Sequence, residues 1–146
     1  MPLLHEDRAH AEITRRVQGL RPENPRKWGR MTIDQMVWHL NQGLLSSMGQ
    51  LQMAPLPAPL PTFIFKPMVL ALPWPKSAPT APEYLAVSQH DFAGEREHCL
   101  QLVEEFTRRP LEGSWVRHAA FGPMSGRDWS RLMYKHMSYH LGQFSA

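Results

Sequence analysis

Proline is concentrated in the middle of this chain of 146 residues, and this restricts where regular structure can form. Nine of the 14 prolines lie in the segment 53–82. They are Pro55, Pro57, Pro59, Pro61, Pro67, Pro73, Pro75, Pro79 and Pro82. Because proline fixes φ and has no amide hydrogen, most of this segment is expected to be extended, with room for one short helix around Phe63–Leu72. We therefore expect two helical halves joined by a long crossover.

The crossover also carries large apolar side chains between residues 63 and 74, which do not suit a solvated linker. One interpretation is that the crossover packs on the helices. The other is that it forms a lid or a dimer contact. We favour the first, because long connections in helical proteins normally have to bury such side chains.

Hydrophobic residues recur every three or four positions in four longer segments, which is the spacing of amphipathic helices. These segments are about His5–Gln18, Thr32–Met48, Asp91–Arg108, and a stretch from Ser125 to near the C-terminus. Both Thr32, with Gln35 three residues later, and Ser125, with Asp128, match helix-start patterns. Only a weak extended pattern at 83–88 competes. The expected fold is therefore all-α: an antiparallel four-helix bundle forming a single domain over residues 1–146, with the crossover 53–82 between its second and third helices.

Composition restricts the chemistry and the partners of the chain. Cys99 is the single cysteine, so neither an internal disulfide nor a Cys-rich zinc module can form, as is typical of a cytoplasmic protein. The net charge of +3 arises within residues 1–30, where acidic residues alternate with basic ones, and this indicates a solvated helix face. The longest apolar stretch, 62–74, is too short to cross a bilayer. We expect no nucleic-acid partner and no membrane partner.

Two of the eight histidines share the apolar face of the last helical segment. His136 and His140 are four residues apart, so their imidazoles are neighbours on one face, close enough to share an ion. The best third ligand is His39, at the edge of the second helix's apolar stripe and one turn before Gly43, whose missing side chain would leave space. The alternative is a buried polar network without metal, in which Gln143, Tyr139 or water completes the hydrogen bonds.

Four stretches of the chain resemble a known family. They are WGRMTIDQMVWHL at 28–40, KSAPTAP at 76–82, FGPMSGRDW at 121–129 and KHMSYHLGQF at 135–144. In this order they resemble DinB-like (DinB/YfiT-like) proteins, in the subgroup that ends in a KHxxxHxxQF motif. The resemblance covers most of the chain from Leu20 onward.

The resemblance implies a four-helix bundle in which one histidine of the second helix and two of the last bind a divalent metal, commonly nickel or zinc. Carried over residue by residue, these ligands are His39, His136 and His140. Related proteins include metal-dependent thiol transferases and isomerases that use small thiols. The resemblance and the apolar stretch 63–74 also favour a homodimer.

These observations predict a divalent-metal-dependent enzyme, a hydrolase or a thiol transferase, that acts on a small molecule or small thiol at a three-histidine site. Glu95 is the candidate for a catalytic proton shuttle, because it lies within the apolar stripe of the third helix. Its simpler role is that of an acidic residue in the first helical turn. The alternative function is a non-catalytic, stress-associated or ligand-binding helical bundle with a structural or vestigial metal site.

Overall fold

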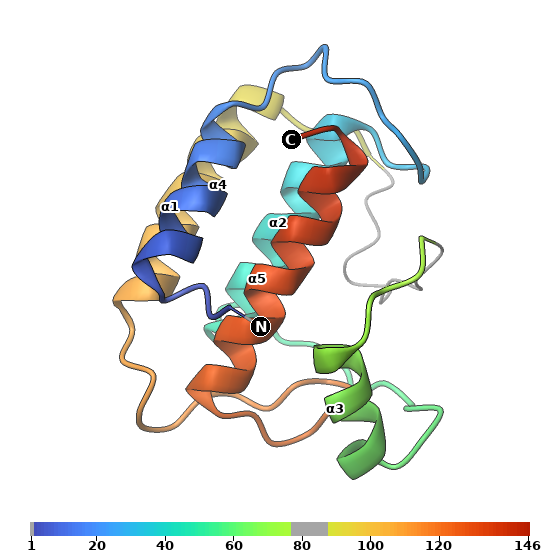
Figure 1. Ribbon diagram of the computed structural model, residues 1–146, viewed down its shortest axis with the longest axis vertical. Helices are drawn as coiled ribbons and strands as arrows, with labels where there is room; N and C mark the ends of the chain where they lie inside the picture. The colour runs from blue at the N-terminus through green and yellow to red at the C-terminus, as the bar shows by residue number, and fades with distance from the viewer. Residues whose placement is uncertain (1, 77–87) are drawn as a thin grey trace.

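The computed structural model describes residues 2–76 and 88–146, and these residues form five α-helices and no strand (Figure 1). The helices are α1 (Asp7–Gln18), α2 (Ile33–Ser47), α3 (Thr62–Ala71), α4 (Phe92–Arg108) and α5 (Gly126–Gln143). The all-α prediction is therefore confirmed for these residues. Residues 77–87, which include the end of the crossover and most of the weak extended pattern, lie outside the described part. Within that part, no helix combines the length and the apolar character that a membrane span requires.

Two helices begin where the capping patterns predicted. Ser125 accepts a hydrogen bond at its Oγ from the Asp128 amide, and Asp128 Oδ2 accepts one from the Ser125 amide, each at 3.0 Å. At the start of α2, the Thr32 amide donates to Gln35 Oε1, also at 3.0 Å. These reciprocal bonds satisfy amides that the first helical turn leaves without an intrahelical partner. The first helix begins at Asp7, two residues later than predicted.

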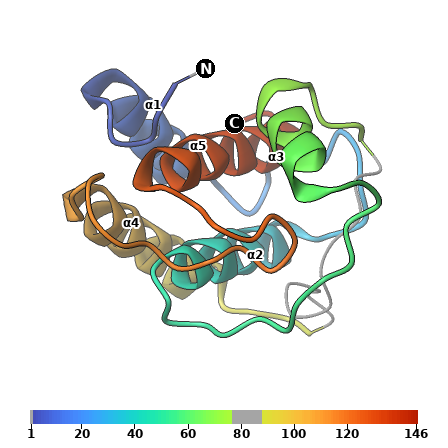
Figure 2. The ribbon, with the colours of Figure 1, turned by 90° about the horizontal axis from the view of Figure 1, so that it is seen from below.

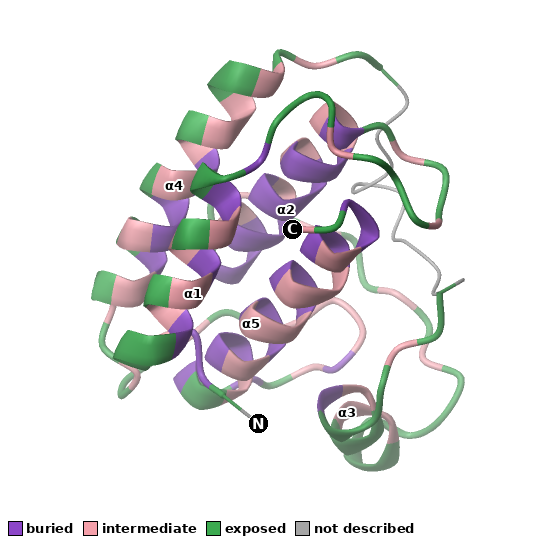
Figure 3. Ribbon diagram, turned by 45° about the horizontal axis from the view of Figure 1, so that its top comes forward, coloured by how far each residue is buried: buried purple, intermediate pink, exposed green. Residues whose placement is uncertain are grey.

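The core lies between α1, α2, α4 and α5. Helix α2 packs against α4 and α5, and α1 packs against the same two helices, so each of the four contacts two others (Figure 2). The buried faces of these helices point toward one another in Figure 3. The predicted apolar stripe of α2 is buried throughout. Its residues are Ile33, Met36, Val37, Leu40, Leu44 and Met48.

The crossover packs on the helices only in part, so the favoured interpretation holds for α3 but not for the whole segment: among its described residues, 53–76, only Leu70 is buried. Helix α3 contacts α5, and Leu70 is the one residue of α3 that is buried. The ring of Phe65 meets that of Phe121, with 5.3 Å between centroids. The opposite side of α3 is open to solvent, and the side chain of Phe63 is 78% exposed. Helix α3 therefore has a packed face and an apolar exposed face.

Candidate metal centre

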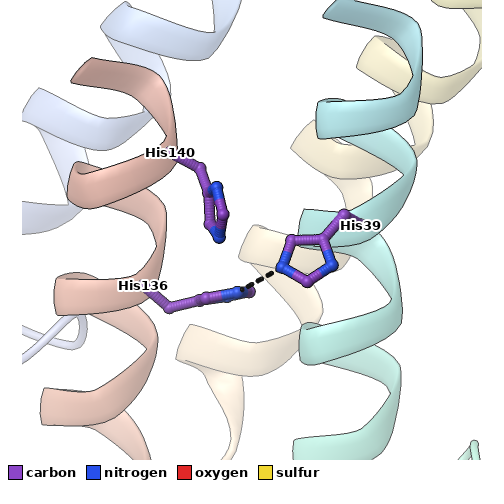
Figure 4. A group of neighbouring side chains, drawn as sticks. All are labelled: His39, His136 and His140. Carbon is purple, nitrogen blue, oxygen red and sulfur yellow. Dashed lines mark hydrogen bonds between the residues drawn. The ribbon is translucent and has the colours of Figure 1, made fainter. Parts of the chain in front are cut away.

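Three histidines meet in the core between α2 and α5. His39 projects from α2, and His136 and His140 project from successive turns of α5 (Figure 4). Nε2 of His39 lies 2.9 Å from Nε2 of His136, and the three ligand nitrogens lie within 4.8 Å of one another. All three residues are buried, with exposed fractions of 3%, 9% and 7% for His39, His136 and His140. The residues predicted from helical periodicity are thus brought together in space.

Burial keeps two of these imidazoles uncharged. Desolvation, helped by the nearby His140 and His39, lowers the pKa of His136 well below its ordinary value of 6.5. Desolvation, together with the neighbouring His39, lowers the pKa of His140 to about 3. Neither imidazole would therefore bind a second proton and become charged at neutral pH. Since a metal ion binds the lone pair of a neutral imidazole, His136 and His140 already have the charge state that a metal requires.

The spacing of the nitrogens suits a shared ion. Two imidazole nitrogens bound at about 2.0–2.1 Å to one tetrahedral zinc ion lie about 3.3 Å apart. The observed 2.9 Å between His39 and His136 is a hydrogen-bond distance between the two rings, and it is a few tenths of an ångström shorter than that separation (Figure 4). Three buried, closely spaced histidines could therefore hold a metal ion.

The Nδ1 atoms of the two α5 histidines, His136 and His140, have different surroundings. Nδ1 of His140 lies 2.7 Å from Oε1 of Gln143, one turn further along the helix. Nδ1 of His136 is buried and has no hydrogen-bond partner among the described residues. Its ring lies beside Gly43 of α2, where an added Cβ would come within 3.0 Å of Cε1. The space left by this glycine, expected next to His39, is in fact occupied by His136.

Two aromatic side chains border the cluster: Trp74, which the sequence did not assign to the site, and Tyr139, which it named as a possible hydrogen-bond partner of the histidines. Trp74, from the crossover, has its ring centroid 6.1 Å from that of His136 and 5.5 Å from that of Tyr139. Tyr139 in turn lies 5.0 Å from His140 and donates a hydrogen bond to the carbonyl of Pro75. The sequence offered one signal for Trp74, a large aromatic residue between two prolines. Its position beside His136 of α5 depends on how the crossover folds back, which no local pattern predicts.

The candidate proton shuttle makes its polar contacts with α2. Glu95 is half-buried, and both its Oε2 and its backbone carbonyl accept hydrogen bonds from Nδ2 of Asn41, at 2.7 and 3.0 Å. Burial, with a smaller effect of the Glu95 charge, raises the pKa of Cys99 to about 12. Cys99 is therefore a neutral core thiol, and Glu95 links α4 to α2.

The other histidines lie apart from the cluster, and one of them corrects the sequence interpretation. His5 was expected on an exposed helix, but it precedes α1. Its ring bonds to Ser130 Oγ at 2.8 Å and to the Arg109 carbonyl at 2.9 Å. His118 is locally hydrogen-bonded, because its Nδ1 accepts from the amide of Ala120 at 2.9 Å. Burial lowers the pKa of His118 to about 4.

Comparison with known proteins gives one assignment. Neither the search of curated proteins nor the search of solved structures found a match. A family model does match residues 5–146, which is almost the whole chain and includes all three histidines of the cluster. The chain therefore belongs to the family described as "Protein of unknown function (DUF1569)".

Proposed function

We propose that this protein is a divalent-metal-dependent enzyme of the hydrolase or thiol-transferase type, acting on a small molecule or small thiol. The observation that carries the proposal is the cluster of His39, His136 and His140, three buried imidazoles whose ligand nitrogens lie within 4.8 Å of one another. The wider framework of the proposal is a DinB-like antiparallel four-helix bundle. The packing of α2 and α5 around the cluster supports it.

The ligand set favours particular ions and a particular chemistry. Imidazole suits nickel and zinc, and three protein ligands leave at least one coordination position for water or substrate. When bound, such an ion would lower the pKa of a coordinated water or thiol and so supply a nucleophile at neutral pH. The chain's own contribution is to hold three buried imidazoles in place and to enclose them between two helices and Trp74. The single buried thiol of Cys99 leaves imidazole as the ligand type, consistent with a protein of the cytoplasm.

One observation favours a second candidate, a non-catalytic bundle whose metal site is structural or vestigial. The carboxylate of Glu95 is hydrogen-bonded to Asn41 at 2.7 Å, so this residue already has a structural role. An enzyme of the proposed type needs a group that moves a proton. Under the second candidate, the ion would link α2 to α5 and add to stability without turnover.

Metal analysis of protein purified without a histidine tag tests the proposal. We expect one nickel or zinc ion per chain after metal addition and dialysis, and loss of that ion in both His39→Ala and His136→Ala. His98→Ala is the matched control, since His98 is a partly exposed residue of α4 outside the cluster. A wild-type chain that retains no stoichiometric metal would contradict the proposal.

Turnover separates the two candidates once metal binding is established. The metal-loaded protein is assayed against activated esters and against small thiols with an electrophilic acceptor. We expect a rate that disappears in His136→Ala and on chelation, while the helical circular dichroism remains. Metal binding without turnover of any member of either substrate class would favour the structural site.

We also propose that the protein forms a homodimer through the exposed face of α3. Supporting this are large apolar side chains that face solvent there, in an otherwise well-packed helical chain. Phe63, Ile64 and Met68 lie in α3 and Leu60 and Leu72 flank it, with exposed fractions between 40% and 78%. A second copy of the same face would cover them.

A further inference from the structure

Gln143 contacts one imidazole of the metal cluster from outside. Its Oε1 lies 2.7 Å from Nδ1 of His140, three residues earlier on α5. Both side chains are buried, with exposed fractions of 6% for Gln143 and 7% for His140. The contact is therefore enclosed by protein, where an unpaired polar atom costs more than it does at a surface.

The chemistry of this contact determines where the proton of His140 resides. A carboxamide oxygen can only accept a hydrogen bond, so Nδ1 of the neutral imidazole must carry the hydrogen. Nε2 is then left with its lone pair. In Figure 4 the far edge of the His140 ring is directed toward His39 and His136. The nitrogen with the lone pair is thus the one that faces the other two ligands.

The position of Gln143 is itself maintained by the loop before α2. The Lys27 amide donates to the backbone carbonyl of Gln143 at 2.6 Å. Gly29 has a φ of +90°, which an L-residue rarely adopts. A Cβ at Gly29 would also lie only 2.8 Å from Nε2 of Gln143. The bare backbone of Gly29 therefore leaves room for the carboxamide beside His140.

We propose that Gln143 is a positioning residue for the metal centre, which fixes His140 in the tautomer that presents Nε2 to the ion. This inference rests on the proposed function for the identity of the ligand, but the tautomer exists without metal. His136 provides the contrast within the cluster, since its Nδ1 has no hydrogen-bond partner in the described residues. When a residue that hydrogen-bonds to a metal ligand is removed, metal affinity typically falls about 10- to 100-fold.

The test combines nuclear magnetic resonance of the metal-free protein with a zinc titration. Imidazole ¹⁵N shifts of histidine-labelled protein report which nitrogen is protonated, and the His140 signals are assigned by their absence in His140→Ala. Wild type is expected to show His140 protonated at Nδ1. Gln143→Met removes the acceptor, so we expect the tautomer to shift and zinc affinity, measured against a chelator, to fall about 10- to 100-fold. Gln143→Glu keeps an acceptor and is expected to preserve both properties.

Gln101→Met serves as the control, because it makes the same change at an exposed position of α4. The proposal is overturned if His140 in the metal-free wild type is protonated at Nε2. It is also overturned if folded Gln143→Met keeps both the tautomer and the zinc affinity of wild type. If wild type binds no zinc but shows the expected tautomer and its loss in Gln143→Met, the metal function fails while the role of Gln143 stands. If Gln143→Met does not fold, the wild-type tautomer and Gln143→Glu decide the question.

Discussion

Gly43 of α2 lies against the imidazole of His136 on α5, so that a Cβ on the glycine would be 3.0 Å from Cε1 and 3.1 Å from Nδ1. This separation is tighter than an ordinary carbon contact, and the ring would have to move by a few tenths of an ångström to accept it. A glycine within a helix costs about 1 kcal/mol relative to alanine. The chain therefore carries a residue that weakens α2 at the point where the metal cluster needs space.

Replacing this glycine is expected to separate stability from metal binding. Gly43→Ala should improve helix propensity while displacing His136, and metal sites tolerate errors of only about 0.2 Å in ligand distance. We expect metal affinity, measured by chelator competition, to fall on the order of 10-fold with little change in helicity. Gly142→Ala is the control, since its Cβ would make an ordinary 3.6 Å contact with Trp28. Equal affinity in the two variants would refute this role of Gly43.

Gly126, the first residue of α5, is expected to tolerate substitution by alanine far less well than Gly43 does. A Cβ there would lie 2.1 Å from the carbonyl oxygen of Leu111 and 2.6 Å from Nε1 of Trp115. The backbone of the preceding loop would have to shift, and forced overpacking of this kind typically costs about 1–3 kcal/mol. Gly126→Ala should therefore lower the urea midpoint of unfolding. A midpoint equal to that of Gly142→Ala would show that the loop moves aside without cost.

Much of the fold and of the candidate site could be predicted because the relevant signals are local. Ser125 and Asp128 are three residues apart, and their reciprocal hydrogen bonds depend only on the first helical turn. His136 and His140 share a face because a helix turns by a constant angle per residue. The apolar neighbours of these two histidines then showed which face is buried.

Features that depend on how separate elements pack could not be predicted in the same way. Gly43 was expected to make room for His39, but the axial offset between α2 and α5 brings it to His136 instead. Trp74 reaches the cluster because α3 folds back along α5, a long-range contact without a local pattern. The pairing of Glu95 with Asn41 likewise depends on the register between α4 and α2.

Acid should destabilise the metal-free protein through its buried imidazoles. Burial lowers the folded-state pKa to about 4 for His118 and about 3 for His140, against an ordinary value of 6.5. Below pH 6.5 these two imidazoles therefore bind protons in the unfolded chain but stay neutral in the folded chain. The contribution of the two buried imidazoles to the free energy of unfolding is fully present above pH 6.5, and it is lost as the pH falls toward their folded-state pKa values.

Urea unfolding of metal-free protein between pH 7.5 and 5 measures this effect. Each buried imidazole should add a slope that approaches about 1.4 kcal/mol per pH unit. His118→Asn removes one titrating ring and keeps an oxygen that can accept from the Ala120 amide, so its slope should be smaller. Stability that does not change over this range would contradict the predicted linkage.

The proposed dimer predicts opposite effects for two neighbouring phenylalanines of α3. Phe63 is 78% exposed, whereas Phe65 packs on Phe121. Phe63→Glu should halve the sedimenting mass at micromolar concentration and leave helicity intact, while Phe65→Glu should reduce stability. Val116→Glu is the control, because Val116 is an exposed apolar residue outside α3. A wild-type mass of one chain, or an unchanged mass in Phe63→Glu, would exclude this interface.

Lys135 of α5 connects the end of α3 to the metal cluster. Its ammonium group donates hydrogen bonds to the carbonyls of Val69, at 2.6 Å, and Leu72. It also lies 5.4 Å from the ring centroid of Trp74, the residue beside His136. Because a positive charge satisfies the last carbonyls of a helix and interacts favourably with its dipole, its removal should loosen the end of α3.

Lys135→Met is therefore expected to speed amide hydrogen exchange in the last turn of α3 and to release metal to a chelator several-fold faster. Lys66→Met provides the comparison, since Lys66 bonds to Asp128 at 2.6 Å and lies closer to the start of α3. That variant should speed exchange mainly in the first turn of α3 and leave the rate of metal release unchanged. If both variants release metal at the wild-type rate, Trp74 and the crossover do not control access to the cluster, and the site must open along another side of α5.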